Sequence, residues 1–249
     1  MNSAFNRTAL LFGEKGMRKL QKSVVAIVGL GGVGSFAAEM LARSGVGTLI
    51  IIDFDRINSS NINRQIPALI STIGQYKCEA LKARLEDINP LAKIIAYNDF
   101  CDSTNRVNVL KDADFIIDAI DSLGPKSGLL EFAYNNKQSI ISCMGAANRV
   151  DPTKINLADI NDVQGCPLAK RVKKYLNKRG IDRGIPVVYS SEEPLILYEV
   201  KTEVEELSSL KRGRERVKLG STSYLPAIIA GWAVSYVLRN LVWNYSLYE

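Results

Sequence analysis

Short apolar runs alternate with segments of helical periodicity through the first 150 residues of the chain. The continuous apolar runs predict buried strands over 23–28, 48–52, 93–97, 115–119 and 139–143. The segments between them predict helices over 33–44, 75–88, 104–111 and 126–136. Because strands that alternate with helices form parallel sheets covered on both faces, the expected fold is α/β, with a Rossmann-like, doubly wound, mostly parallel sheet.

The pattern changes after Asp151-Pro152, where we expect a C-terminal extension of the same domain. Short strands are predicted over 187–190 and 195–200, and a closing apolar helix over 224–243. This helix is long enough to cross a membrane. Its Pro226 in the first turn and Arg239 near the C-terminus favour a helix of the core or of a subunit interface instead.

The composition is that of a globular protein, and it excludes several kinds of catalysis. The 249 residues include no histidine, which rules out Ser-His-Asp and Cys-His machinery and His-ligated metals. The four cysteines form no C-x-x-C pair, so neither a structural zinc site nor a disulfide framework is expected. Residues 1–22 contain no apolar signal segment. We expect a cytoplasmic location, with peripheral membrane association through the last helix as the alternative.

A glycine-rich turn directly follows the first predicted strand and precedes the first predicted helix. Its glycines, Gly29, Gly31, Gly32 and Gly34, match the G-x-G-x-x-G pattern, which lets the backbone approach a phosphate at a helix N-terminus. Asp53 ends the next strand, about 20 residues further on, where a carboxylate is placed to bind a ribose hydroxyl. Together these features predict a nucleotide site.

The loops after the other strands favour a triphosphate over a dinucleotide. Since the carboxyl ends of parallel strands share one edge of a sheet, these loops are expected to meet the glycine turn. Arg64 and Lys77 supply positive charge for phosphate oxygens, and Asp121 supplies a carboxylate for Mg²⁺. Other candidate nucleotide contacts on these loops are Asp55, Asn61, Asn63 and Ser122. The pattern predicts a site for ATP and magnesium.

The second half of the chain contains two basic clusters. The first comprises Lys170, Arg171, Lys173, Lys174, Lys178 and Arg179, and the second comprises Lys211, Arg212 and Arg214. With a net charge of +6, this density predicts contacts to a nucleic-acid backbone, and a solvated charged face is the alternative. Cys166 is the candidate reactive thiol, because nearby cations favour a thiolate. Cys143 ends an apolar strand and is expected in the core.

These motifs, in this order, resemble the signature of the E1-like adenylating family, which includes ubiquitin-activating enzymes and bacterial relatives in thiamine and molybdopterin synthesis. The resemblance is carried by residues 29–34, Asp53-x-Asp55, Asn61-x-Asn63-Arg64-Gln65, Lys77 and Asp118-x-x-Asp121. It implies that Asp53 holds the ribose, that Arg64 and Lys77 bind phosphates, and that Asp121 binds Mg²⁺ while a carboxylate is activated as its acyl-adenylate. It also implies a homodimer in which Arg7 of one subunit reaches the phosphates of the other.

Within this family, the chain most resembles the branch that dehydrates threonylcarbamoyladenosine in tRNA. The similar segments are 7–13, 118–122, 143–146, 151–153, 166–169 and 220–224. The resemblance implies ATP-dependent activation of the threonyl carboxylate on the modified adenosine at tRNA position 37, followed by ring closure. Residues 1–150 are then expected to form the adenylation region, and residues 151–249 the tRNA-binding and dimerisation region of the same domain.

Two alternatives stay open at this point. One is adenylation of the C-terminal glycine of a ubiquitin-like sulfur-carrier protein, with a sulfur-transfer or desulfurase partner, although the usual zinc-binding C-x-x-C pairs are missing. The other is a non-catalytic Rossmann module that senses a nucleotide and binds RNA, which intact Arg64, Lys77 and Asp121 argue against. Some members of the dehydratase branch carry a cysteine just before the last helix, where this chain has Leu219-Gly220.

Overall fold

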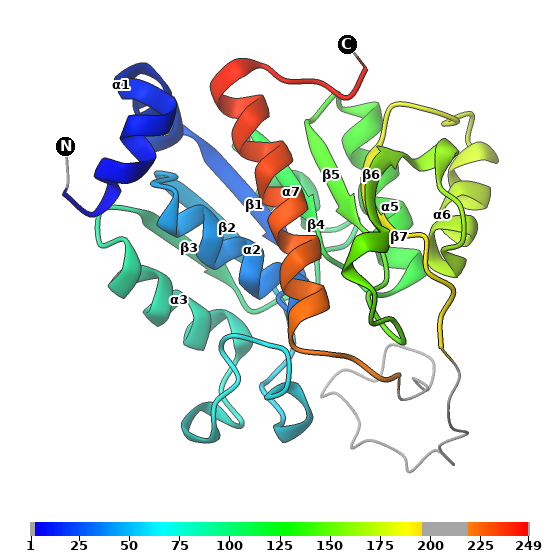
Figure 1. Cartoon of the computed structure of the whole chain (residues 1–249), viewed down its shortest axis with the longest axis horizontal. Helices are drawn as coiled ribbons and strands as arrows, with labels where there is room; N and C mark the ends of the chain where they lie inside the picture. Colours follow the sequence, from blue (N-terminus) through cyan, green and yellow to red (C-terminus); the bar gives the residue numbers. More distant parts are fainter. Residues whose placement is uncertain (1–2, 196–218, 249) are drawn as a thin grey trace.

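Seven strands form one sheet in the computed structural model, which describes residues 3–195 and 219–248 (Figure 1). The strand order is β3-β2-β1-β4-β5-β7-β6. Neighbouring strands are parallel except for β6, which runs antiparallel to β7. The strands are β1 Val24–Val28, β2 Thr48–Ile52, β3 Lys93–Tyr97, β4 Phe115–Asp118, β5 Ile140–Cys143, β6 Ile155–Asp159 and β7 Pro186–Ser190. The predicted doubly wound α/β fold is confirmed.

Helices cover both faces of this sheet (Figure 1). They are α1 Asn6–Lys22, α2 Gly32–Arg43, α3 Lys77–Ile88, α4 Arg106–Leu110, α5 Leu123–Asn135, α6 Pro167–Asn177 and α7 Tyr224–Trp243. Residues of α1, α2, α3 and α7 join one hydrophobic core, and residues of α4, α5 and α6 join the other. Short 3-10 turns lie at Ser3–Phe5, Ser59–Asn61, Ile70–Thr72, Pro152–Lys154 and Ile160–Asp162.

Strands β1 and β2 are almost entirely apolar because each supplies both cores. In β1, Val25 and Ile27 face one core, whereas Ala26 and Val28 face the other. The run of apolar residues in Thr48–Ile52 is divided between the cores in the same way. A parallel sheet buried on both faces requires such continuous runs, which is why the sequence identified these strands.

The closing helix α7 packs in the core, as the sequence favoured. By length and composition it could cross a membrane, yet 56% of its most apolar 18-residue window is buried inside the protein. Leu225, Ile229 and Ala233 are fully buried in the core that α2 shares. The helix therefore buries much of its apolar surface against this face of the sheet.

Some elements differ from the sequence expectation. Strand β6 was not predicted, because a short antiparallel edge strand with half-buried positions gives little apolar signal. The strand expected over 195–200 is absent at Leu195, and 196–200 lie outside the described residues. The helices expected over 33–44, 75–88, 104–111 and 126–136 are present, with ends that differ by at most three residues.

The strand order places a crevice at the carboxyl edge of the sheet. Strand β1 pairs with β2 on one side and with β4 on the other. The chain therefore winds outward in opposite directions from β1 and β4, and ligands of such folds bind where that reversal occurs. The loops after β1, β2 and β4 all end at this edge.

Candidate functional site

The glycine turn between β1 and α2 is packed too tightly for side chains at two of its positions. Gly29 has φ +90°, and a Cβ on it would lie 2.9 Å from the carbonyl oxygen of Ala119. A Cβ on Gly34 would lie 1.8 Å from the carbonyl oxygen of Gly29. Glycine is therefore required for α2 to start directly against the turn and for the turn to touch the end of β4.

The N-terminus of α2 is built to attract an anion. Its N-cap residue is Gly31, and no side chain makes a capping hydrogen bond there. The first amide groups of a helix have no carbonyl partner within the helix, and the helix dipole adds partial positive charge. The amide groups of Gly32, Val33 and Gly34 can thus bind phosphate oxygens, whereas the Ser35 amide already donates to the Gly31 carbonyl.

Asp53 joins the glycine turn to the loop after β2. Its carboxylate accepts hydrogen bonds from the Leu30 amide at 2.6 Å and from the Asp55 amide at 2.8 Å. Burial raises the pKa of the Asp53 carboxyl, and the nearby Lys77 ammonium offsets part of that rise. The side chain is thereby fixed at the end of β2, where the sequence placed the ribose ligand.

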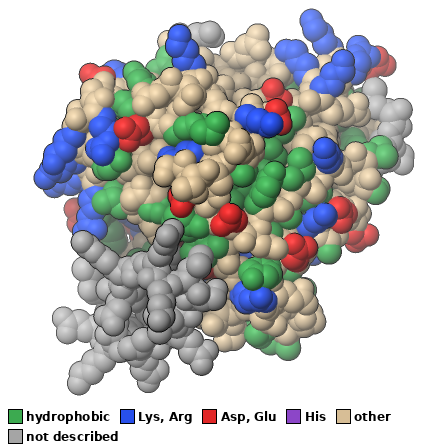
Figure 2. All heavy atoms as spheres, turned by 180° about the vertical axis from the view of Figure 1, so that it is seen from behind, with side chains coloured by type: hydrophobic (Ala, Val, Ile, Leu, Met, Phe, Trp, Pro, Cys, Tyr) green, Lys and Arg blue, Asp and Glu red, His purple; other side chains and the backbone are tan. Residues whose placement is uncertain are grey.

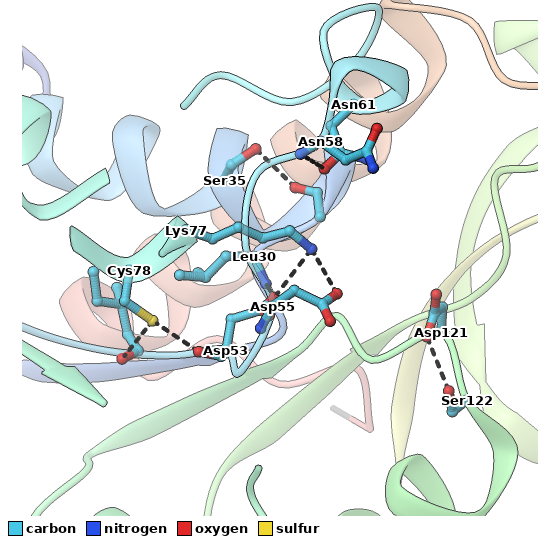
Figure 3. Close-up of polar contacts among 12 residues, drawn as sticks. Leu30, Ser35, Asp53, Asp55, Asn58, Asn61, Lys77, Cys78, Asp121 and Ser122 are labelled. Carbon is cyan, nitrogen blue, oxygen red and sulfur yellow. Dashed lines mark hydrogen bonds and ion pairs between the residues drawn. The ribbon is translucent and has the colours of Figure 1, made fainter. Parts of the chain in front are cut away.

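Lys77 lies in the same carboxylate cluster (Figure 3). Its Nζ is 2.8 Å from Asp55 Oδ2 and 3.9 Å from Asp53 Oδ2, and its side chain is buried. The predicted role in binding phosphate stays a prediction, because here the ammonium group is paired with carboxylates. Lys77 begins α3, so the cluster also fixes the start of that helix.

Arg64 lies in the loop that crosses the glycine turn. Its Nη1 donates to the Ser60 carbonyl at 2.9 Å and to Asn63 Oδ1 at 2.8 Å. A Cβ on Gly32 would lie 3.3 Å from the Arg64 carbonyl oxygen, so the two loops touch. Asn61 accepts from the Asn58 amide and closes the first turn of this loop. The structure therefore brings the Asn61–Arg64 motif to the predicted phosphate site.

Gln65 is a residue of this site to which the sequence assigned no role. It is buried, and its Nε2 would be 4.0 Å from a Cβ on Gly31. Its Oε1 is also buried and has no hydrogen-bond partner within the described part of the chain. A buried acceptor without a donor is costly, so this oxygen fits a donor supplied by a bound ligand.

A fully buried ion pair lies beneath the loop after β4. Lys126 Nζ is 2.6 Å from Asp118 Oδ2 and donates to the hydroxyl of Ser142 at 3.0 Å and to the carbonyl of Cys143 at 2.9 Å. Lys126 and Asp118 are both 0% exposed. The sequence did not reveal this buried ion pair, because a lysine near the start of a predicted helix is usually exposed to solvent.

Asp121 is presented to solvent at the end of the same loop. It accepts a hydrogen bond from the Ser122 hydroxyl at 3.0 Å, and Figure 3 shows both residues on a separate loop across from Asp55 and Lys77. Within residues 3–195 and 219–248, no three acidic or cysteine side chains cluster as a protein-only metal site. One exposed carboxylate facing a phosphate site nevertheless suits Mg²⁺, which usually binds through one or two carboxylates together with substrate phosphates.

Arg7 does not reach this site within its own chain. A Cβ on Gly45, just past the C-terminus of α2, would lie 3.6 Å from the ring of Phe5. The glycine turn is at the opposite end of α2, a helix of 12 residues and hence about 18 Å long. Arg7 is exposed in the first turn of α1, two residues after Phe5.

The residues of the first basic cluster differ in their contacts. Lys173 donates to the Asn161 carbonyl, whereas Arg179 pairs with Glu131 at 2.9 Å and stacks on Tyr175. Lys170, Arg171, Lys174 and Lys178 are exposed, as is the paired Arg179. The second cluster, Lys211, Arg212 and Arg214, lies outside the described residues.

All four cysteines are buried. Cys143 is a core residue, as the sequence predicted, and burial raises its pKa to about 12. Cys166 caps α6 and is 4% exposed among apolar side chains, an environment that argues against the predicted reactivity.

The fold and the site together define a nucleotide-binding protein of the doubly wound α/β class, with a glycine-rich turn at the switch point of its sheet. A model of the ThiF family matches residues 5–246. The chain therefore belongs to the ThiF family, which confirms the resemblance to E1-like adenylating proteins.

Individual relatives differ in how much of the chain they match. The tRNA threonylcarbamoyladenosine dehydratase of Bacillus subtilis is 39% identical over 243 residues, 95% of each chain. A solved structure of the Escherichia coli tRNA N6-threonylcarbamoyladenosine dehydratase in complex with ATP has a TM-score of 0.83 and 31% identity, covering 95% of this chain and 93% of that one. The molybdopterin-synthase adenylyltransferase of Escherichia coli is 34% identical over 149 residues, only 59% of each chain.

Proposed function

We propose that this protein is an ATP-dependent tRNA threonylcarbamoyladenosine dehydratase. The observation that carries the proposal is the convergence of the glycine turn, Asp53, Arg64, Lys77 and Asp121 on one sheet edge, in a chain similar to such dehydratases over nearly its whole length. The relatives in molybdopterin synthesis match a much smaller share of the chain.

In this proposal ATP lies across the crevice between β1 and β4. Its phosphates bind the amides at the start of α2 and the guanidinium of Arg64, a residue whose backbone carbonyl touches the glycine turn. Lys77 is then shared between phosphate and Asp55. Asp53 holds a ribose hydroxyl, and the unpaired Gln65 Oε1 accepts from a nucleotide N–H or O–H.

Asp121 would hold Mg²⁺ with its exposed carboxylate. When bound, the ion neutralises charge on the phosphates of ATP. Ser122 donates to the same carboxylate and keeps it oriented.

The reaction needs no nucleophile from the protein, which agrees with a chain without histidine and with buried thiols. A threonyl carboxylate oxygen attacks the α-phosphorus of ATP, and pyrophosphate leaves. The carbamoyl group of the same nucleoside then attacks the activated carbonyl carbon, a proton is released, and AMP leaves. Because the attacking and activated groups are on one molecule, ring closure has a high effective molarity.

We also propose a homodimer in which Arg7 acts on the partner's nucleotide. The distance along α2 keeps Arg7 from its own site, so a second subunit is needed to bring it there. Helix α1 also exposes Leu10 and Leu11, at 88% and 72%, as apolar surface that a partner would cover.

Mass spectrometry of tRNA nucleosides tests the proposal. The protein is incubated with ATP, Mg²⁺ and tRNA that carries threonylcarbamoyladenosine. The expected result is loss of the mass of one water from that nucleoside, with release of AMP and pyrophosphate. Asp121→Ala should abolish the reaction, whereas Asp112→Ala, which changes an exposed aspartate just before β4 at the opposite edge of the sheet, should retain it.

Pyrophosphate release separates this function from its alternatives. If a sulfur-carrier protein ending in glycine stimulates release and modified tRNA does not, the chain is a carrier-activating enzyme, and a sulfur-transfer partner becomes the expected associate. If neither carboxylate substrate stimulates release, the enzymatic proposal is wrong. A cytoplasmic location remains part of the proposal and is tested by fractionation of cells.

A further inference from the structure

Helix α6 presents a row of lysines to solvent, and its inner face is buried. Ala169, Val172 and Leu176 on its inner face are buried in the second hydrophobic core. Lys170, Lys174 and Lys178 follow one another at four-residue intervals, about 6 Å apart along the helix axis. They therefore share one face, and together with Lys173 and Asn177 they line a shallow hollow of about 460 Å³.

The positive charge of this row is not balanced by the protein. Two basic residues near it are paired with acids, Arg179 with Glu131 and Arg183 with Asp162. Within the described ranges, Lys170, Lys174 and Lys178 form no salt bridge. Figure 2 shows blue side chains gathered along the edge of the molecule where α6 lies. A field of one sign over several charges attracts polyanions.

Helix α6 also packs on α5, the helix that follows the loop carrying Asp121. It packs on α5 through Tyr175, whose hydroxyl donates to Glu131 at 3.2 Å, and through the Arg179–Glu131 ion pair. Helix α5 itself begins at Leu123, directly after Asp121 and its neighbour Ser122. A large polyanion that rests on α6 is therefore held at a fixed position relative to the loop that carries Asp121.

We propose that the exposed face of α6 binds the phosphodiester backbone of the substrate tRNA, away from the modified nucleotide. The inference rests on the proposed function. Lysine ammonium groups bind phosphate as point charges and carry no base-reading geometry, so this surface contributes affinity without sequence preference. An anionic membrane fits less well, because the residues between the lysines on this face are polar rather than the bulky apolar residues that enter a bilayer.

The salt dependence of tRNA binding tests the surface. In the triple variant Lys170→Gln/Lys174→Gln/Lys178→Gln, loss of three phosphate contacts should reduce the slope of log K against log salt by about 2 to 3. The KM for tRNA should rise about tenfold or more at moderate salt. The KM for ATP, kcat at saturating tRNA and the thermal unfolding temperature should stay near wild-type values.

The matched control removes three exposed charges at the edge of the sheet opposite the glycine turn. Lys93 is the first residue of β3, and Lys111 and Lys137 lie shortly before β4 and β5, all three exposed. Lys93→Gln/Lys111→Gln/Lys137→Gln should leave the slope and the KM for tRNA unchanged. If this control weakens tRNA binding as much as the α6 variant does, the effect is one of net charge and the proposal is overturned.

Three further outcomes test the α6 surface and the proposed function separately. A wild-type enzyme that modifies tRNA, combined with an α6 variant of unchanged slope and KM, overturns the surface but leaves the proposed function intact. A wild-type enzyme that neither binds nor modifies tRNA overturns the proposed function itself. If α6 substitution abolishes binding to phosphatidylserine vesicles while leaving tRNA binding unaltered, the surface is a membrane contact.

Discussion

Lys126 links the strand β4 to the loop that carries the proposed metal ligand. Its ammonium group and the hydroxyl of Ser142 both donate to Asp118 Oδ2 at 2.6 Å. The other carboxylate oxygen of Asp118 accepts from the Ile120 amide at 3.1 Å. The turn that precedes Asp121 is thus bonded to a carboxylate whose own position depends on Lys126.

A double-mutant cycle should measure how strongly this buried pair couples. Lys126→Met leaves a buried Asp118 carboxylate without its cation, and we expect it to lower the free energy of unfolding by about 3–5 kcal/mol. Lys126→Met/Asp118→Asn should recover part of this loss, because the amide oxygen can still accept from Ile120 and no buried charge remains. Urea unfolding of both single variants and the double variant is the measurement. Additive losses would contradict the coupling.

The buried thiols should be unreactive at neutral and mildly alkaline pH. Burial raises the pKa of Cys78 and Cys143 to about 12 and that of Cys101 to about 11, so deprotonation at pH 8 is rare. Because the thiolate is the reactive form, iodoacetamide should label the native protein very slowly from pH 7 to pH 9. Labelling should become fast in urea, because unfolded thiols have an ordinary pKa of about 8.5. Rapid native labelling of Cys166 would instead support the reactive thiol expected from the sequence.

At the scale of elements, the contact between α2 and the glycine turn depends on one missing methyl group. Gly34 lies inside α2, where glycine normally weakens a helix. Its retention is explained by the Gly29 carbonyl, which occupies the position of a Cβ. The N-terminus of α2 can therefore sit against the phosphate site only because residue 34 has no side chain.

Two glycine substitutions should have opposite effects. Gly34→Ala forces α2 away from the turn, and we expect a loss of about 1–3 kcal/mol in unfolding free energy together with weaker ATP binding. Gly231→Ala in α7 meets no atom within 4 Å, so it should raise stability by about 0.5–1 kcal/mol. Thermal unfolding with and without ATP measures both effects. Unchanged ATP affinity in Gly34→Ala would contradict the proposed cradle.

At the scale of the whole molecule, the separation of Arg7 from the glycine turn predicts complementation between subunits. Arg7→Ala and Asp121→Ala should each be inactive as homodimers. When the two variants are mixed and exchange subunits, a heterodimer contains one site with both residues intact. Activity should recover to as much as a quarter of wild type for random exchange of equal amounts, since half of the dimers then carry one functional site of two.

The recovery is measured as pyrophosphate release after unfolding and refolding of the mixture. A mixture of Arg7→Ala with Arg7→Ala/Asp121→Ala should show no recovery, because no site in it has an intact Arg7. If Arg7→Ala alone retains full activity, the residue has no role across the interface. If the protein is monomeric by analytical ultracentrifugation while active, the dimer proposal is wrong.

Local sequence was sufficient to identify the central strands and to predict which residues line the nucleotide site. Buried parallel strands must be apolar on both faces, and a phosphate turn must be glycine-rich, so local sequence was enough to identify β1, β2 and the turn at 29–34. It also predicted Asp53, Arg64, Lys77 and Asp121 as site residues, since each lies in a loop after a strand or at the start of the following helix.

The contacts of individual charged side chains became apparent only in the folded protein. The same residue types in residues 170–179 separate into Lys173 and Arg179, which bond to neighbouring elements, and the exposed row of Lys170, Lys174 and Lys178. Lys126 proved to be a buried partner of Asp118, and Arg7 proved to lie at the far end of α2 from its own site. Such roles depend on contacts between residues distant in sequence, and hydrophobic periodicity contains no information about them.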